Sequence, residues 1–343
     1  MKERNLQLDA IKGGAILLVV LGHSLQVHDV RFDSNLLFRL IYSFHMPLFM
    51  AASGWVAKPQ EPRRLKQIAI RLGLPTLTWY LIQFFVERGS QSSGIGSYIW
   101  SFLKYPDLGL WFLWILLICQ FLLSAAYWLE QKIGIISYAL VWSVLWLSPS
   151  HDFGIQLTRY YFVYFSAAFL VARNFKSLCR MLPVTVALAL VTYPVSFLFW
   201  HRSLAHGFSA TQIHSPEVAI GFLCDHVISA VSGCILFAVS IIFVRPPAAL
   251  KGLGWLGRRT LEIYVSHQLL VPLVGGTNRL GIFVSFLFAI LGSLVIARLA
   301  QNSKLLYLVL YGTLGSARPE PYGLDMVSGF PTESTASTAS HEG

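Results

Sequence analysis

Charge is scarce in this chain. Only 12% of its 343 residues are Asp, Glu, Lys or Arg, about half the share of a typical soluble domain. Hydrophobic residues make up 55%, and the mean hydropathy is +0.60. This balance excludes an ordinary soluble domain and predicts a protein embedded in a lipid bilayer.

Patterns that mark metal, disulfide or nucleotide sites are also lacking. The four cysteines contain no CxxC pair and lie in or beside apolar runs, so we interpret them as packing residues. HxxxH and HExxH spacings are absent, and no metal site is expected. The glycines at 13–14 and 252–257 match neither a Walker nor a Rossmann spacing.

Long apolar runs dominate what remains. They predict about ten membrane spans, near residues 9–28, 36–57, 68–86, 108–128, 133–149, 157–173, 181–200, 218–244, 255–274 and 281–300. The expected fold is therefore all-α and polytopic, with residues 1–302 as the integral membrane domain. Residues 303–343 comprise a short apolar segment and a Gly/Pro/Ser/Thr-rich tail expected to be disordered.

The basic residues set the expected orientation. With the N-terminus inside, all but seven of the 26 Lys and Arg residues fall at inner ends of the spans; the seven are Arg31, Arg39, Arg88, Lys104, Arg159, Arg202 and Arg279. This bias predicts that both termini are cytoplasmic. We interpret the net charge of +10 as a topology signal first, and no nucleic-acid partner is expected.

The first span carries three ionisable residues on one stripe. A helix turns 100° per residue, so Lys12 and His23 face within about 20° of each other, roughly 16 Å apart. Asp9 lies at i, i+3 from Lys12. An ionisable group deep in an apolar run is a functional-site candidate. We therefore interpret His23 as functional, against the alternative of a histidine that joins two helices by a hydrogen bond.

Polar residues also interrupt two later spans. His45 is expected at a depth similar to that of His23, as a substrate contact or as a support for His23. Two residues later, Pro47 should kink the second span. Ser53, with the Gly that follows it, suits either a substrate contact or close helix packing.

The segment TLEIYVSHQLL at 260–270 adds Glu262, Tyr264, Ser266 and His267. The first and third of these share one helix face and the other two share another. No single face collects all four, so some of these side chains must bond to neighbouring helices while others remain candidates for substrate contact.

The densest basic cluster follows the second span, with five cations at Lys58, Arg63, Arg64, Lys66 and Arg71. One interpretation is contact with lipid headgroups combined with positive-inside sorting. The other is a docking surface for a phosphorylated cytoplasmic ligand, because Arg forks match phosphate oxygens.

Five motifs in order resemble the acyltransferase-3 family of multi-pass bacterial membrane O-acyltransferases, which modify cell-surface sugars. They span Arg4–His23, Phe44–Gly54, Arg71–Pro75, Leu110–Leu116 and Leu261–Gln268. The family usually has Arg at the position of Lys12. A Lys there is similar to the fucose 4-O-acetylase branch, which includes nodulation-factor acetyltransferases.

The resemblance implies a reaction, a set of partners and a location. The donor would be acetyl-CoA or another acyl-CoA, and the acceptor would be a glycan hydroxyl. The enzyme would lie in the bacterial inner membrane and would need no cofactor. His23 would act as general base, and Asp9 with Lys12 would shape the inner mouth of the site. The oxyanion stabiliser stays open among Tyr264, Ser266 and His267.

A proton-coupled secondary transporter of a sugar or anion is the main alternative, since ten spans with intramembrane His and Glu would suit one. Against it, no pair of Gly/Pro-broken helices stands at corresponding positions of two halves. A purely structural membrane protein is the third interpretation, and it would require every intramembrane polar residue to serve helix packing.

Overall fold

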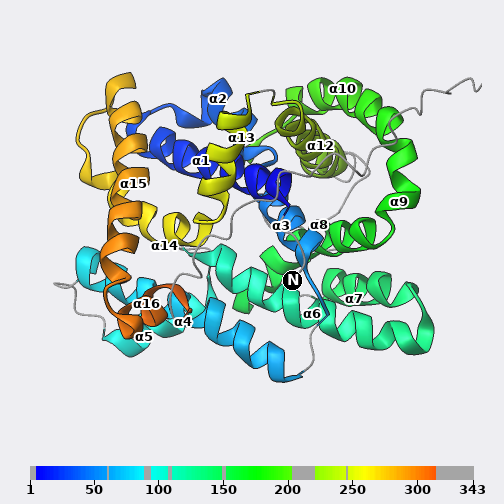
Figure 1. Ribbon diagram of the computed structural model, residues 1–343, viewed down its shortest axis with the longest axis horizontal. Helices are drawn as coiled ribbons and strands as arrows, with labels where there is room; N and C mark the ends of the chain where they lie inside the picture. The colour runs from blue at the N-terminus through cyan, green and yellow to red at the C-terminus, as the bar shows by residue number, and fades with distance from the viewer. Residues whose placement is uncertain are drawn as a thin grey trace, which may run out of the picture.

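Helices make up nearly all of the computed structural model, which describes residues 5–59, 62–88, 94–106, 110–148, 152–202, 221–244 and 246–313. No strand occurs within these ranges. The longer helices, labelled as in Figure 1, are α1 (Leu6–His28), α2 (Leu36–Tyr42), α3 (His45–Val56), α4 (Pro62–Arg88), α5 (Ile95–Lys104), α6 (Trp111–Ile133), α7 (Ile136–Leu147), α8 (Ile155–Arg173), α10 (Leu182–Leu198), α12 (Ser229–Ile242), α13 (Pro247–Gly257), α14 (Thr260–Leu270), α15 (Arg279–Ala300) and α16 (Lys304–Tyr311). The predicted all-α class is confirmed.

The predicted multi-pass membrane character is supported, but the count of ten spans is not confirmed. Among the described residues, six helical segments are long and apolar enough to cross a bilayer: Leu6–His28, Leu36–Val56, Leu65–Val86, Trp111–Ile133, Phe175–Leu198 and Arg279–Ala300. Two shorter apolar helices, Ile136–Leu147 and His226–Ile242, match two more of the predicted runs. The other two predicted runs correspond to α8 and to α14 with the end of α13, which carry more polar residues.

The second span is broken, as Pro47 predicts. Helix α2 ends at Tyr42, and α3 restarts at His45, which puts Pro47 in the first turn of the new helix. A proline is tolerated there because the first backbone N–H groups of a helix have no partner within it. The break turns the start of α3 and its His45 side chain into the protein interior, where His45 is buried.

Helix α1 lies at the centre of the packing and contacts α2, α3, α12, α13, α14 and α15 (Figure 1). Its closest neighbour is α13, and two glycines allow the approach. A Cβ at Gly13 would lie 1.9 Å from the carbonyl oxygen of Leu253, and one at Gly257 would lie 1.7 Å from that of Asp9. These glycines therefore serve close helix packing, which fixes the height and rotation of α1.

The packing interpretation of the Ser53–Gly54 pair also finds support. A Cβ at Gly54 would lie 2.0 Å from the carbonyl oxygen of Phe165, so α3 and α8 touch backbone to backbone at that point. By contrast, α10 and α15 leave most of their leucine, valine and phenylalanine side chains exposed, as lipid-facing helices do.

The short apolar segment after residue 302 forms α16 and packs against α4. The indole N–H of Trp79 donates to the carbonyl of Leu310 at 2.9 Å, and Tyr307 donates to Glu262 of α14. This segment therefore packs onto the helices of the 1–302 domain. The tail expected to be disordered, residues 315–343, lies outside the described residues.

Candidate active site

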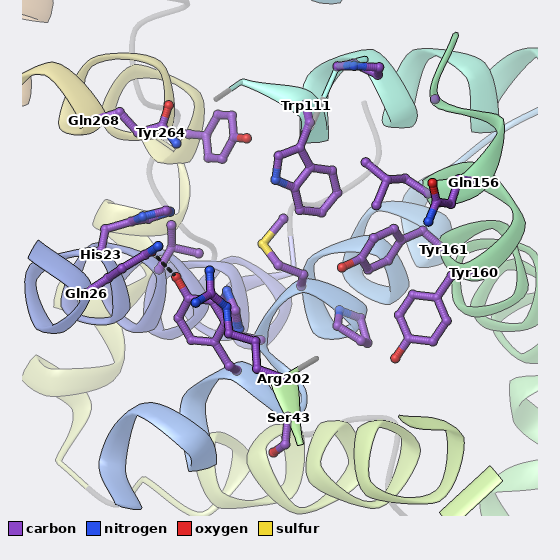
Figure 2. A pocket seen from close by; sticks show the side chains of 18 of the residues that line it. His23, Gln26, Ser43, Trp111, Gln156, Tyr160, Tyr161, Arg202, Tyr264 and Gln268 are labelled. Atoms are coloured by element: carbon purple, nitrogen blue, oxygen red, sulfur yellow. Dashed lines mark hydrogen bonds between the residues drawn. The ribbon is translucent and has the colours of Figure 1, made fainter. Parts of the chain in front are cut away.

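Two cavities among the described residues bear on the predicted site. One contains His23, and we call it the His23 cavity. Its volume is about 1200 Å³. Figure 2 shows side chains from α1, α6, α8 and α14 arranged around it; the labelled residues include His23, Gln26, Trp111, Gln156, Tyr160, Tyr161, Tyr264 and Gln268. Two of these rings, Trp111 and Tyr161, stack at 5.0 Å between centroids. The cavity thus combines flat aromatic faces with amide groups that can donate and accept hydrogen bonds.

The second cavity, which we call the Lys12 cavity, has a volume of about 490 Å³. Three cations line it, Lys12 from α1, Lys58 after α3 and Arg71 from α4. Ser53 and Gln120 add polar groups. This concentration of positive charge suits a polyanionic ligand.

Tyr264 lines both cavities. Its ring meets that of Phe112 edge to face at 5.4 Å, and Phe112 meets Phe49 in the same way at 5.6 Å. The Tyr264 hydroxyl also accepts a hydrogen bond of 3.3 Å from the backbone N–H of Phe112, near the start of α6. We call these three rings the aromatic partition. All three line the Lys12 cavity, and Tyr264 also lines the His23 cavity.

His23 is surrounded by other polar side chains. The ring of His267 on α14 lies 5.2 Å from its ring, centroid to centroid. On the next turn of α1, Gln26 accepts a 3.0 Å hydrogen bond from the Tyr42 hydroxyl (Figure 2). The His45 ring packs on Tyr42 at 4.6 Å, and Tyr42 in turn bonds to Gln26.

The predicted residues divide between the two cavities. His23 and His45 line the first, Lys12, Ser53 and Arg71 line the second, and Tyr264 joins them. The stripe on α1 therefore opens into two spaces. Within the described part of the chain, no group of three His, Cys, Asp or Glu residues could hold a metal ion.

Other predicted residues line neither cavity. Asp9 is buried where α1 touches α13, and Lys66 is exposed on α4. Glu262 is held by Tyr307 and by Arg259, whose Nε lies 3.8 Å from its carboxylate. We interpret Glu262 as an anchor for α16. The side chain of Arg64 lies outside the described part of the structure.

Sequence reasoning missed several lining residues. Tyr160 and Tyr161 are adjacent in α8, and their polar rings are the reason that this predicted span looked interrupted. His226 lies in a π-helical stretch, Leu223–Ile228, and its carbonyl accepts hydrogen bonds from the hydroxyls of Tyr160 and Tyr164 at 3.2 and 3.1 Å. Such π-helical turns are frequent at functional sites, but no sequence pattern reveals them.

Comparison with known proteins now identifies the family. The family model described as an acyltransferase domain matches residues 5–300. The chain is 29% identical to the nodulation protein NolL of Sinorhizobium fredii over 287 residues, 76% of each chain. It is 39% identical to NolL of Mesorhizobium japonicum over 85 residues, 22% of this chain and 23% of the relative. No solved structure matches. These matches confirm the resemblance, and the chain belongs to the acyltransferase-3 family of acyl-transferring enzymes.

Proposed function

We propose that this enzyme is a membrane O-acetyltransferase, with acetyl-CoA as donor and a glycan hydroxyl as acceptor. One observation carries the proposal. Helix α1 presents Lys12 to a cavity whose charged lining is all cationic. It presents His23 to a cavity of aromatic rings and amides that Asp33, Arg39 and Arg202 also line, and Tyr264 lines both. This arrangement suits a reaction between a polyanionic donor in one cavity and a polar acceptor in the other.

The donor is assigned to the Lys12 cavity. The nucleotide end of acetyl-CoA carries phosphates, which favour Lys12, Lys58 and Arg71 as charge partners. Acetyl-CoA is made in the cytoplasm and cannot cross a bilayer unaided, because its phosphates would lose their hydration in hydrocarbon. The orientation predicted from Lys and Arg, with both termini cytoplasmic in the bacterial inner membrane, puts these cations on the cytoplasmic side.

The acceptor is assigned to the His23 cavity. Its volume of about 1200 Å³ exceeds the usual range of small-molecule sites, roughly 300–1000 Å³, and so leaves room for more than one sugar unit. Trp111 and Tyr161 offer flat faces, and Gln26, Gln156 and Gln268 offer amides. A surface or secreted glycan is also in keeping with the resemblance to the nodulation-factor branch.

In the proposed reaction His23 removes the proton from the acceptor hydroxyl as the oxygen attacks the thioester carbonyl. The carbon–sulfur bond then breaks, and the CoA thiolate takes the proton from His23. The ester and free CoA are the products. For the thioester to reach His23, the thin pantetheine arm must pass the aromatic partition, so its rings must move apart when donor binds.

The transporter alternative loses its support once the chain is placed in a family of acyl-transferring enzymes.

The proposal is tested by mass spectrometry of surface and secreted glycans from cells that lack the gene and cells complemented with wild type, His23→Ala or His28→Gln. His28 is the matched control, because it lies on the same helix and bonds to Gly276 outside both cavities.

Acetyl groups on a glycan should appear with wild type and His28→Gln and be missing in the other two strains. Identical glycans in all four strains would refute the proposed acceptor class. Acetylation that persists in the His23→Ala strain would refute the role of His23 as general base.

A further inference from the structure

His267, predicted from the sequence as a substrate contact, is not among the residues that line either described cavity. The side chain is fully buried on α14. Its ring instead lies 5.2 Å from the ring of His23, tilted by 52°. It can therefore act on the reaction through His23.

The hydrogen bonds of His267 fix its tautomer. Its Nδ1 atom lies 2.6 Å from the carbonyl oxygen of Tyr264 and 3.1 Å from that of Ile263. A carbonyl oxygen can only accept, so Nδ1 must carry a proton. In the neutral ring the other nitrogen, Nε2, is then a bare acceptor.

That acceptor is buried and has no hydrogen-bond partner among the described residues. A buried polar atom left unpaired costs free energy comparable to a lost hydrogen bond. The two imidazoles are not hydrogen-bonded to each other in this structure, and the His23 side chain instead bonds to Gln26. A turn of the His23 ring would let it supply the missing donor. Ring nitrogens lie about 1.2 Å from their centroid, so facing nitrogens of two rings 5.2 Å apart can come within about 2.8 Å, a hydrogen-bond distance.

We propose that His267 is a positioning residue whose Nε2 accepts the N–H of His23 once the His23 ring turns toward it during the reaction. This bond would fix the tautomer of His23, so that its lone pair faces the acceptor hydroxyl in the His23 cavity. When His23 takes the hydroxyl proton, the positive charge on its ring strengthens the same bond. The proton stays on His23 until the CoA thiolate takes it, so no further acid or base is needed. A buried partner orients a working histidine in the same way in metal sites and hydrolases.

The inference rests on the proposed role of His23, and the test separates the two. CoA release from acetyl-CoA is measured by chromatography on purified protein with water in place of the sugar, for wild type, His23→Ala, His267→Gln, His267→Asn and His267→Phe. The Gln amide extends to the position of Nε2, whereas the Asn amide extends only to the position of Nδ1. Both variants carry the same amide group and differ only in side-chain length.

We expect His267→Asn and His267→Phe to lower kcat by about 10- to 100-fold with KM for acetyl-CoA unchanged, and His267→Gln to restore most of the loss. If the Asn and Phe variants keep the wild-type kcat while His23→Ala is inactive, the inference about His267 is overturned and the proposed function stands. Equal losses in Gln and Asn would also overturn it, because reach would then be irrelevant. Full activity in His23→Ala would refute the proposed function itself. If the Phe variant fails to fold, the Gln and Asn pair decides.

Discussion

The contact between α1 and α13 gives the sharpest prediction about the frame of the site. In a Gly13→Ala variant, the new Cβ would lie 1.9 Å from the carbonyl oxygen of Leu253, whereas real Cβ contacts stay beyond 3.0 Å. Because the atom it meets is backbone and cannot swing aside, the two helices must separate by about 1 Å or more. Overpacking of this kind costs about 1–3 kcal/mol and sometimes more.

The same shift would displace Lys12 and His23, which α1 holds in their cavities. A displacement of about 1 Å can cost 100-fold in rate, so activity should fall even where the variant remains folded. Gly257→Ala meets the carbonyl oxygen of Asp9 at 1.7 Å and should behave alike. Gly252→Ala is the control. Gly252 lies on the same helix as Gly257, and a Cβ at this position would meet nothing within 4 Å. Alanine is also a better helix former than glycine by up to about 1 kcal/mol.

The assay is the loss of the monodisperse peak in detergent after heating, followed by CoA release at a temperature where each variant is intact. We expect Gly13→Ala and Gly257→Ala to lose their peaks several degrees below wild type, and Gly252→Ala to match or exceed wild type. Equal stability of Gly13→Ala and Gly252→Ala would refute the close packing of α1 on α13.

Three further predictions concern the donor cavity, the partition and the C-terminal helix. If Lys12 serves the donor phosphates by charge, Lys12→Ala should raise KM for acetyl-CoA while Lys12→Arg stays close to wild type; a lower kcat at saturating donor with KM unchanged would contradict this role. Phe112→Leu replaces one ring of the aromatic partition with a smaller side chain, so it should raise CoA release in the absence of acceptor and admit longer acyl-CoAs. Phe121 is exposed on the same helix, and Phe121→Leu should change neither property. Tyr307→Phe removes the hydroxyl that donates to buried Glu262 and should lower stability in thermal unfolding by about 1–3 kcal/mol, without changing KM for acetyl-CoA.

Hydropathy along the sequence predicted where helices form, because each apolar run has to satisfy its backbone within itself. A helix is found at every predicted run, and the break before Pro47 follows from the missing N–H of proline. Runs with polar interruptions, such as α8, were harder to interpret. Their polar rings face a cavity inside the protein, and hydropathy averages do not distinguish that from exposure to water.

Periodicity indicates which residues share a helix face but not which faces meet. It placed Lys12 and His23 on one stripe, yet it did not predict that the stripe opens into two cavities. The aromatic partition joins α3, α6 and α14, residues far apart in the sequence. Glu262 illustrates the same limit, since its partner Tyr307 lies on a helix that the sequence placed outside the membrane domain.

The measurement that tests the central claim most directly is CoA release by the purified protein given acetyl-CoA as its only donor. The account predicts slow release by wild type and by His28→Gln, and a rate lower by about 10²–10⁴ for His23→Ala, the usual cost of removing a general base. Acetyl-CoA left intact by folded wild-type protein, or equal release by His23→Ala and wild type, would contradict acyl transfer at His23.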